Sequence, residues 1–88
     1  MLGQFNTHTY NGTAEEKNEL RRLTTEQGIR LWQSETGSGG RGIDGNLRMA
    51  KRLIEDIRCL QPAAWVDWQY VEQRGDQWSL VTSHDWKT

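Results

Sequence analysis

Hydrophobic and polar positions follow two different periods along this chain. Residues 4–10 alternate and are rich in aromatic and β-branched side chains, which predicts a strand. Residues 45–61 instead carry apolar side chains at helical spacing, which predicts an amphipathic helix with one inner face. That inner face is expected to consist of Leu47, Ala50, Leu53, Ile54, Ile57 and Leu60.

Another helix is predicted over residues 13–27, from signals at both of its ends. Thr13 and Glu16 have the spacing of a capping box, in which each side chain accepts from the other residue's backbone N–H. Gly28 is suited to end this helix in the left-handed conformation. The inner stripe of the helix is expected at Leu20 and Leu23, with Ala14 and the stem of Lys17 above them.

Further strands are predicted over residues 29–35 and 63–71, with a short fourth one over 78–82. Asp44 or Asn46 is expected to cap the helix between the second and third strands. The order β-α-β-α-β, with one helix in each crossover, is typical of parallel strands in an α/β fold. We therefore expect residues 1–88 to form one domain. Three parallel strands cannot close a barrel, so both edges of this sheet should be open.

Composition excludes several classes of function. The 88 residues carry a net charge of −1 without a basic cluster, which argues against a nucleic-acid partner. No apolar run is long enough to span a membrane, and the first residues do not resemble a signal peptide. Cys59 is the single cysteine, and neither His8 nor His84 has metal-ligand spacing with an acidic residue, so we expect no metal and no cofactor.

Candidate chemistry lies where the predicted strands end. In parallel α/β folds the carboxyl ends of the strands meet at one edge, where sites are usually built. Here that edge would carry His8 and Tyr10, then Glu35, then Trp68 and Tyr70. Taken singly, each has a plainer reading: a carboxylate at a strand end is usually solvated, the histidine is more often structural, and the tryptophan is more often core. The glycine-rich segment after the glutamate lacks the Lys-Ser/Thr ending of a phosphate-binding loop.

Three of these segments, in order, resemble glycoside hydrolase family 30, in particular its endo-β-1,6-galactanase-like branch. Residues 31–39, LWQSETGSG, resemble the segment of strand seven that carries the nucleophile. Residues 7–10, THTY, resemble the end of strand six, and residues 64–69, AWVDWQ, resemble strand eight. Residues 51–56 with 60–62 resemble the intervening helix and its exit. The resemblance implies a partial (β/α)8 TIM barrel that corresponds to strands six to eight.

The resemblance also implies a role for each candidate residue. Glu35 would be the catalytic nucleophile, and Tyr10 would hydrogen-bond it or the sugar and help set its ionisation. His8 would orient sugar hydroxyls and Trp68 would pack on an apolar sugar face, so both would bind substrate with Tyr10. Asp67 would point to the other side of its strand and be structural. The implied partner is a carbohydrate, and the implied location is extracellular.

One departure from the family limits the expected activity. A retaining glycosidase needs a second carboxyl group as acid/base, which in this family is a Glu that follows an Asn at the end of strand four. The Asn18-Glu19 pair of this chain falls inside the first predicted helix, so we expect negligible turnover by the chain alone. Two alternatives stay open: a non-catalytic carbohydrate-binding remnant, and a half-barrel that self-associates through its open sheet edges.

Overall fold

The computed structural model describes residues 3–37, 42–69, 71–73 and 81–83. Its first five elements alternate strand and helix, as the sequence predicts. They are β1 (Gln4–His8), α1 (Ala14–Glu26), β2 (Arg30–Thr36), α2 (Gly42–Cys59) and β3 (Ala64–Asp67). Two further strands, β4 (Val71–Gln73) and β5 (Val81–Ser83), pair with each other in a separate parallel sheet.

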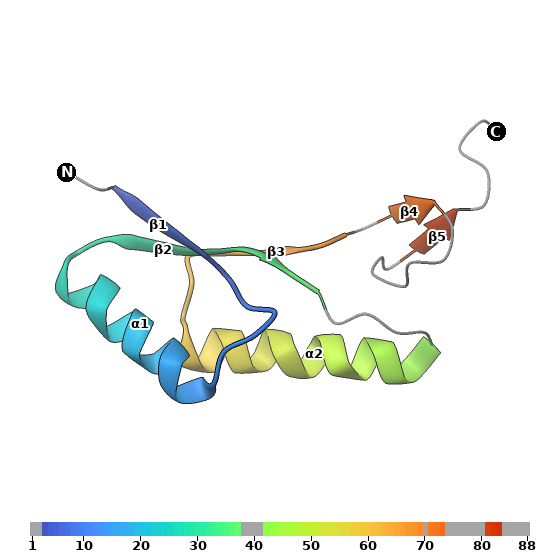
Figure 1. Ribbon diagram of the computed structural model, residues 1–88, viewed down its shortest axis with the longest axis horizontal. Coiled ribbons are helices and arrows are strands. Elements are labelled where there is room, and N and C mark those ends of the chain that lie inside the picture. The colour runs from blue at the N-terminus through green and yellow to red at the C-terminus, as the bar shows by residue number, and fades with distance from the viewer. Residues whose placement is uncertain (1–2, 38–41, 70, 74–80, 84–88) are drawn as a thin grey trace.

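The first three strands form one parallel sheet in the order β1-β2-β3. Both helices lie on the same side of this sheet (Figure 1), as expected when each crossover has the same hand. The expected α/β fold, a β-α-β-α-β unit with an open three-stranded parallel sheet, is therefore confirmed. Among the described residues β1 and β3 are its two edges.

The limits of α1 follow from the signals at its two ends. Thr13 is the residue before the helix, and its side-chain oxygen accepts from the backbone N–H of Glu16 at 3.1 Å. At the other end Gly28 has a φ of 65°, the left-handed conformation expected of it. The inner stripe agrees with the prediction at Lys17, which is buried. It differs at Leu23 and Ala14, which are exposed, and at Thr24, which is buried in their place.

Two predicted strand ends are wrong. The first strand ends at His8 and not at residue 10, because its register with β2 shifts between Thr7 and His8. The third strand ends at Asp67 and not at residue 71, directly before the cis peptide bond between Trp68 and Gln69. In the short fourth strand, residues 81 and 82 belong to β5, and residues 78–80 lie outside the described part.

The start of α2 also differs from the prediction. Asp44 and Asn46 were the expected caps, but the helix already begins at Gly42. Asp44 therefore lies in the first turn, where a carboxylate stabilises the exposed N–H groups of the helix.

A buried glutamine joins β2 to β3. Their pairing is irregular between Gln33 and Thr36, so the backbone ladder does not supply every partner. The side-chain oxygen of Gln33 accepts the backbone N–H of Val66 at 2.8 Å and replaces the missing carbonyl. Because Gln33 is fully buried, its position in the centre of the sheet depends on this bond.

The side of α2 that meets the sheet is unexpectedly polar. Of the predicted inner face, only Leu60 is fully buried, at 1% exposure, whereas Leu47 is 60% exposed and Ile54 and Ile57 are also exposed. In their place the sheet-facing side carries Asp56, which is completely buried. The prediction that the apolar stripe of this helix faces the core is therefore wrong within the described residues.

Asp56 holds four elements together. Its Oδ2 accepts from the hydroxyl of Thr9 at 2.6 Å and from the indole N–H of Trp65 at 2.9 Å. Its Oδ1 lies 2.9 Å from the ammonium of Lys17 on α1. Burial opposes the charge of Lys17, but hydrogen bonds to Glu55 and Asp56 outweigh it and raise the pKa of this lysine. A buried carboxylate with three donors replaces the leucine contacts that the sequence suggests.

Candidate functional site

Glu35 is the penultimate residue of β2 and lies at the carboxyl end of the parallel sheet. In the regular register His8 would pair with Ser34, but the shift after Thr7 pairs His8 with Glu35 instead. The backbone N–H of Thr9 then donates to the carbonyl of Glu35 at 3.2 Å. The irregularity therefore brings the end of β1 directly beside the glutamate.

Two side chains from the end of β1 contact the Glu35 carboxylate. The hydroxyl of Tyr10 donates to Oε1 at 3.1 Å, and Nδ1 of His8 lies 3.1 Å from Oε2. The two rings are edge-on to each other, with centroids 6.3 Å apart. The Glu35 side chain is 28% exposed, so the carboxylate is partly desolvated and still reachable from solvent.

The phenol of Tyr10 is held in its protonated form. Burial raises its pKa, and the hydrogen bond to Glu35 and the negative charges of Glu35 and Asp67 raise it further. The positive charge of Arg52 acts in the opposite direction. Because the net pKa lies above the ordinary value of 10.0, Tyr10 is a donor to Glu35 at neutral pH.

Trp68 follows β3 at the same edge of the sheet. Its backbone N–H donates to the carbonyl of Thr36 at 2.6 Å, which places it beside the end of β2. Trp65 bonds Asp56 on the helix side, so alternation puts Val66 and Trp68 on the opposite face. The Trp68 side chain is 50% exposed and has a free apolar surface.

Asp67 is a buried carboxylate without a side-chain donor among the described residues. Neither of its side-chain oxygens is solvent-accessible, and neither has a side-chain donor among the described residues. Burial raises its pKa above the ordinary 3.8, and the backbone N–H of Trp68 lowers the pKa by less. By alternation with Trp65 it faces the helix side, as the sequence analysis expects, and its charge still reaches Tyr10.

Arg52 is a residue of this region that the sequence analysis did not single out. Its Nη1 donates to the carbonyl oxygens of Thr9 at 2.7 Å and Tyr10 at 2.9 Å, and to the hydroxyl of Thr36 at 3.2 Å. It lies on α2 one turn before Asp56. One feature of the sequence could have indicated Arg52. It lies four positions before Asp56, so the two charged residues share one side of a helix that also has an apolar stripe.

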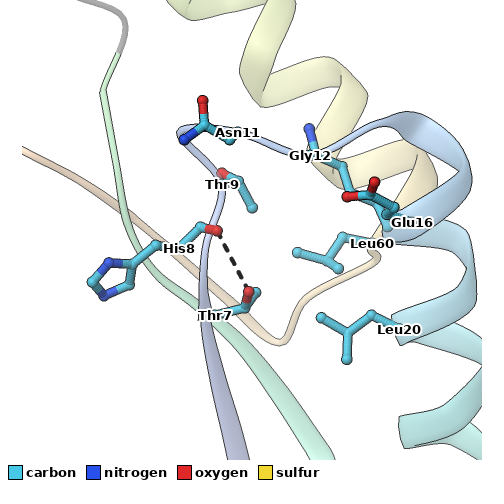
Figure 2. A pocket seen from close by; sticks show the side chains of 9 residues that line it. Thr7, His8, Thr9, Asn11, Gly12, Glu16, Leu20 and Leu60 are labelled. Carbon is cyan, nitrogen blue, oxygen red and sulfur yellow. Dashed lines mark hydrogen bonds between the residues drawn. The ribbon is translucent and has the colours of Figure 1, made fainter.

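A separate cavity of about 290 Å³ lies on the other side of β1, between the end of that strand and α1. Figure 2 shows Leu20 and Leu60 at this cavity, while the imidazole of His8 points away from it. The backbone carbonyl of His8 is turned toward Thr7, whose hydroxyl lies at 3.4 Å. The cavity and the carboxylate of Glu35 are therefore different features of the molecule.

Two other expectations concern metals and membranes. Within the described ranges no group of three or more His, Cys, Asp or Glu side chains is arranged to hold a metal ion. Neither helix in that part of the chain is long and apolar enough to cross a bilayer. Tyr70, His84 and the glycine-rich residues 38–41 lie outside the described part, so the candidate role of Tyr70 stays a prediction.

Comparison with known proteins finds a distant and partial similarity. The chain is 32% identical over 81 residues to an endo-β-1,6-galactanase of Hypocrea rufa. The match covers 92% of this chain but 16% of the galactanase, so the chain spans about a sixth of the length of this relative. No protein-family model matches the chain, and no solved structure matches it.

Proposed function

We propose that this chain is a segment of a retaining glycoside hydrolase of the family 30 type, with Glu35 as its nucleophile. The proposal rests chiefly on the Glu35 carboxylate, which lies at the carboxyl end of a parallel sheet and is contacted by Tyr10 and His8. The partial similarity to a galactanase supports a β-1,6-galactan-like substrate. In this proposal β1, β2 and β3 correspond to strands six to eight of a (β/α)8 barrel.

The chemistry of such a nucleophile is a double displacement. One oxygen of Glu35 attacks the anomeric carbon while the glycosidic C–O bond breaks, and the departing oxygen takes a proton from a second carboxylic acid. Water then attacks the anomeric carbon of the glycosyl ester and gives a proton to the second carboxylate, while the bond to Glu35 breaks and its carboxylate is restored. The hydrogen bond from Tyr10 keeps the other carboxylate oxygen oriented during both steps.

The remaining residues fit substrate binding. His8 is more than half exposed, so its imidazole can exchange its contact with Glu35 for one with a sugar hydroxyl. The free apolar surface of Trp68 suits the C–H face of a pyranose. A polysaccharide substrate also favours an extracellular location, as the family resemblance implies.

The acid/base residue is not provided by the described sheet ends. Asn18 and Glu19 lie in the second turn of α1, away from the end of any strand. General acid catalysis contributes about 10²–10⁴-fold, so we expect negligible turnover by these 88 residues alone. Release of galactose or oligosaccharides from β-1,6-galactan by the purified chain would contradict this expectation.

The nucleophile is tested in the polypeptide that the whole open reading frame encodes. We expect Glu35→Gln to abolish turnover of β-1,6-galactan and to leave binding of the oligosaccharide within a few-fold of the parent. A 2-deoxy-2-fluoro galactoside should label Glu35, as detected by peptide mass spectrometry. The matched control is Glu19→Gln, an exposed helix carboxylate whose loss should spare turnover. An active Glu35→Gln protein would exclude the nucleophile role.

A second candidate is carbohydrate binding without catalysis. The half-exposed indole of Trp68 favours it, because this surface can bind a sugar whether or not an acid/base is present. The two candidates differ in the fully encoded protein, where binding without turnover in the parent would support the second.

A third candidate is self-association. Both edges of the sheet are open among the described residues, and exposed strands can pair with a second copy. A stable monomer in light scattering of a dilute solution would argue against it.

A further inference from the structure

We propose that Arg52 is a positioning residue that holds Tyr10 against Glu35 by fastening the end of β1 to the end of β2. Its importance for catalysis rests on the proposed function of Glu35. The positioning itself does not, because it concerns contacts within the chain. The argument starts from the place where β1 stops.

Tyr10 needs an anchor outside the strand. β1 ends at His8, and the last backbone bond from this segment to β2 is the one from Thr9 N–H to Glu35. Beyond that point the ladder no longer determines where the chain goes. Yet the hydroxyl of Tyr10 reaches Glu35 at 3.1 Å, so its backbone must be held within a narrow range.

Arg52 provides this anchor from the neighbouring helix. Its Nη1 carries two protons, and the shortest contacts are to the carbonyl oxygens of Thr9 at 2.7 Å and Tyr10 at 2.9 Å. Both bonds are charge-assisted and therefore stronger than bonds between neutral groups. A single side-chain nitrogen thus holds the two peptide groups that lead out of β1.

The same nitrogen also contacts the strand that carries the glutamate. The hydroxyl of Thr36 lies 3.2 Å from Nη1, and Thr36 directly follows Glu35 and is fully buried. Because the ends of the two strands share one guanidinium, the separation of Tyr10 from Glu35 is determined by Arg52. Asp56 supports the arrangement from one turn further along α2, where it accepts the Thr9 hydroxyl.

Loss of Arg52 has two opposing effects on Tyr10. Among the described residues, the charged or titratable groups that act on this phenol or touch it include Glu35, Asp67, Arg52 and His8. Removal of the arginine charge raises the pKa of Tyr10, whereas loss of the contact with Glu35 lowers it. A single substitution is therefore ambiguous, and a double-mutant cycle separates the two effects.

The measurement is the pKa of Tyr10 by NMR titration of the tyrosine ring carbons. The chain has two tyrosines, so Tyr70→Phe leaves Tyr10 as the single signal. In this background Glu35→Gln should lower the pKa of Tyr10, because it removes a negative neighbour. The proposal predicts that Arg52→Met abolishes most of this Glu35-dependent difference. An undiminished difference in a folded Arg52→Met chain would overturn the proposal.

Arg58 is the matched control. It lies on the same helix and is exposed, so Arg58→Met should leave the Glu35-dependent difference unchanged. An equal loss in Arg58→Met and Arg52→Met would show a general effect of helix charge and contradict positioning. Arg52→Lys keeps the charge and should restore part of the difference, which a purely structural role in folding does not require.

A further measurement needs no substitution at Arg52. In the parent chain the Nη1 protons of Arg52 should exchange slowly and its guanidinium should rotate slowly in NMR spectra, unlike those of Arg58. Fast rotation at Arg52 would overturn the proposal even if Arg52→Met failed to fold. None of these measurements uses a substrate, so failure of the glycosidase proposal and failure of the positioning proposal are distinguished.

Discussion

The two faces of α2 differ in a way that reverses the usual arrangement. The face that meets the sheet carries Arg52, which bonds Thr36 of β2, and Asp56, which bonds Trp65 of β3. The opposite face carries a stripe of exposed apolar residues, Ile43, Leu47, Ile54 and Ile57. Within the described part of the chain, side-chain hydrogen bonds therefore join this helix to the sheet, and ion pairs from Glu55 and Asp56 to Lys17 join it to α1. Apolar residues at helical spacing can thus mark a face that the described residues do not cover.

The largest expected effect is at Asp56. Asp56→Ala leaves the Lys17 ammonium without one of its two carboxylate partners and the Thr9 and Trp65 donors without an acceptor. Breaking a buried pair in this way costs about 3–5 kcal/mol. Urea unfolding followed by circular dichroism measures the loss. Asp44→Ala, at an exposed position of the same helix, should cost less than about 1 kcal/mol. Similar losses of stability in Asp56→Ala and Asp44→Ala would show that the two faces of α2 do not differ in this way.

The next largest effect on stability is expected at Leu60, directly after α2, and it is compared with Leu47 within the helix. Leu60 is almost fully buried, so Leu60→Ala should destabilise the chain by about 2–5 kcal/mol. Leu47 is mostly exposed, so Leu47→Ala should change the free energy of unfolding by less than about 0.5 kcal/mol. The midpoints of urea unfolding provide the measurement. A large cost at Leu47 would show that the stripe is covered in solution.

Substitution of Asp67 is expected to have a smaller effect on the free energy of unfolding, and to raise it. This carboxylate is buried like Asp56 but has no side-chain donor among the described residues, and burial raises its pKa more than the backbone N–H of Trp68 lowers it. Because the pKa of Asp67 is higher in the folded than in the unfolded chain, its protonated form contributes stability below about pH 4. This contribution is lost as the pH rises through the pKa of the folded state. Asp67→Asn removes the charge and should stabilise the chain at pH 7 by about 1 kcal/mol.

The pH dependence separates this explanation from a simple packing change. At pH 3, where Asp67 is protonated in the parent, Asp67→Asn should have almost the same free energy of unfolding as the parent. Equal stabilisation at pH 3 and pH 7 would show that the gain does not come from the charge. A loss at pH 7 would mean that the carboxylate has a favourable partner.

The smallest effect on stability is expected when charged residues replace members of the exposed apolar stripe of α2. Leu47→Lys with Ile54→Lys should leave the unfolding midpoint of the monomer nearly unchanged, because both positions are exposed. The same pair of substitutions should abolish any concentration-dependent association that the apolar stripe mediates, as measured by light scattering. Association that persists in the double variant would instead be attributed to the open sheet edges.

Much of the fold follows from local patterns. The strand β1, the cap at Thr13 and the left-handed Gly28 each depend on a few neighbouring residues, and the structure has all three. The limits of β1 and β3 were missed because a register shift and a change of chain direction depend on the partner strand. Likewise α2 begins at Gly42 although Asp44 has the better capping side chain.

The candidate site divides in the same way. Strand ends of a parallel sheet meet at one edge, so the approach of His8 and Tyr10 to Glu35 follows from the order of elements. The extra residue in β2 that pairs His8 with Glu35 leaves no signal in the sequence. Arg52 was missed because its partners are mainly backbone carbonyls, which any residue type provides.

The sequence by itself determined the order of strands and helices, their parallel arrangement and the edge at which Glu35 lies. Tertiary structure decided which side of α2 meets the sheet. Periodicity shows that a helix has an apolar stripe, but the stripe becomes core only if other parts of the chain cover it. A buried charge is tolerated only where donors converge, and the Thr9 donor of Asp56 lies 47 residues away in the sequence.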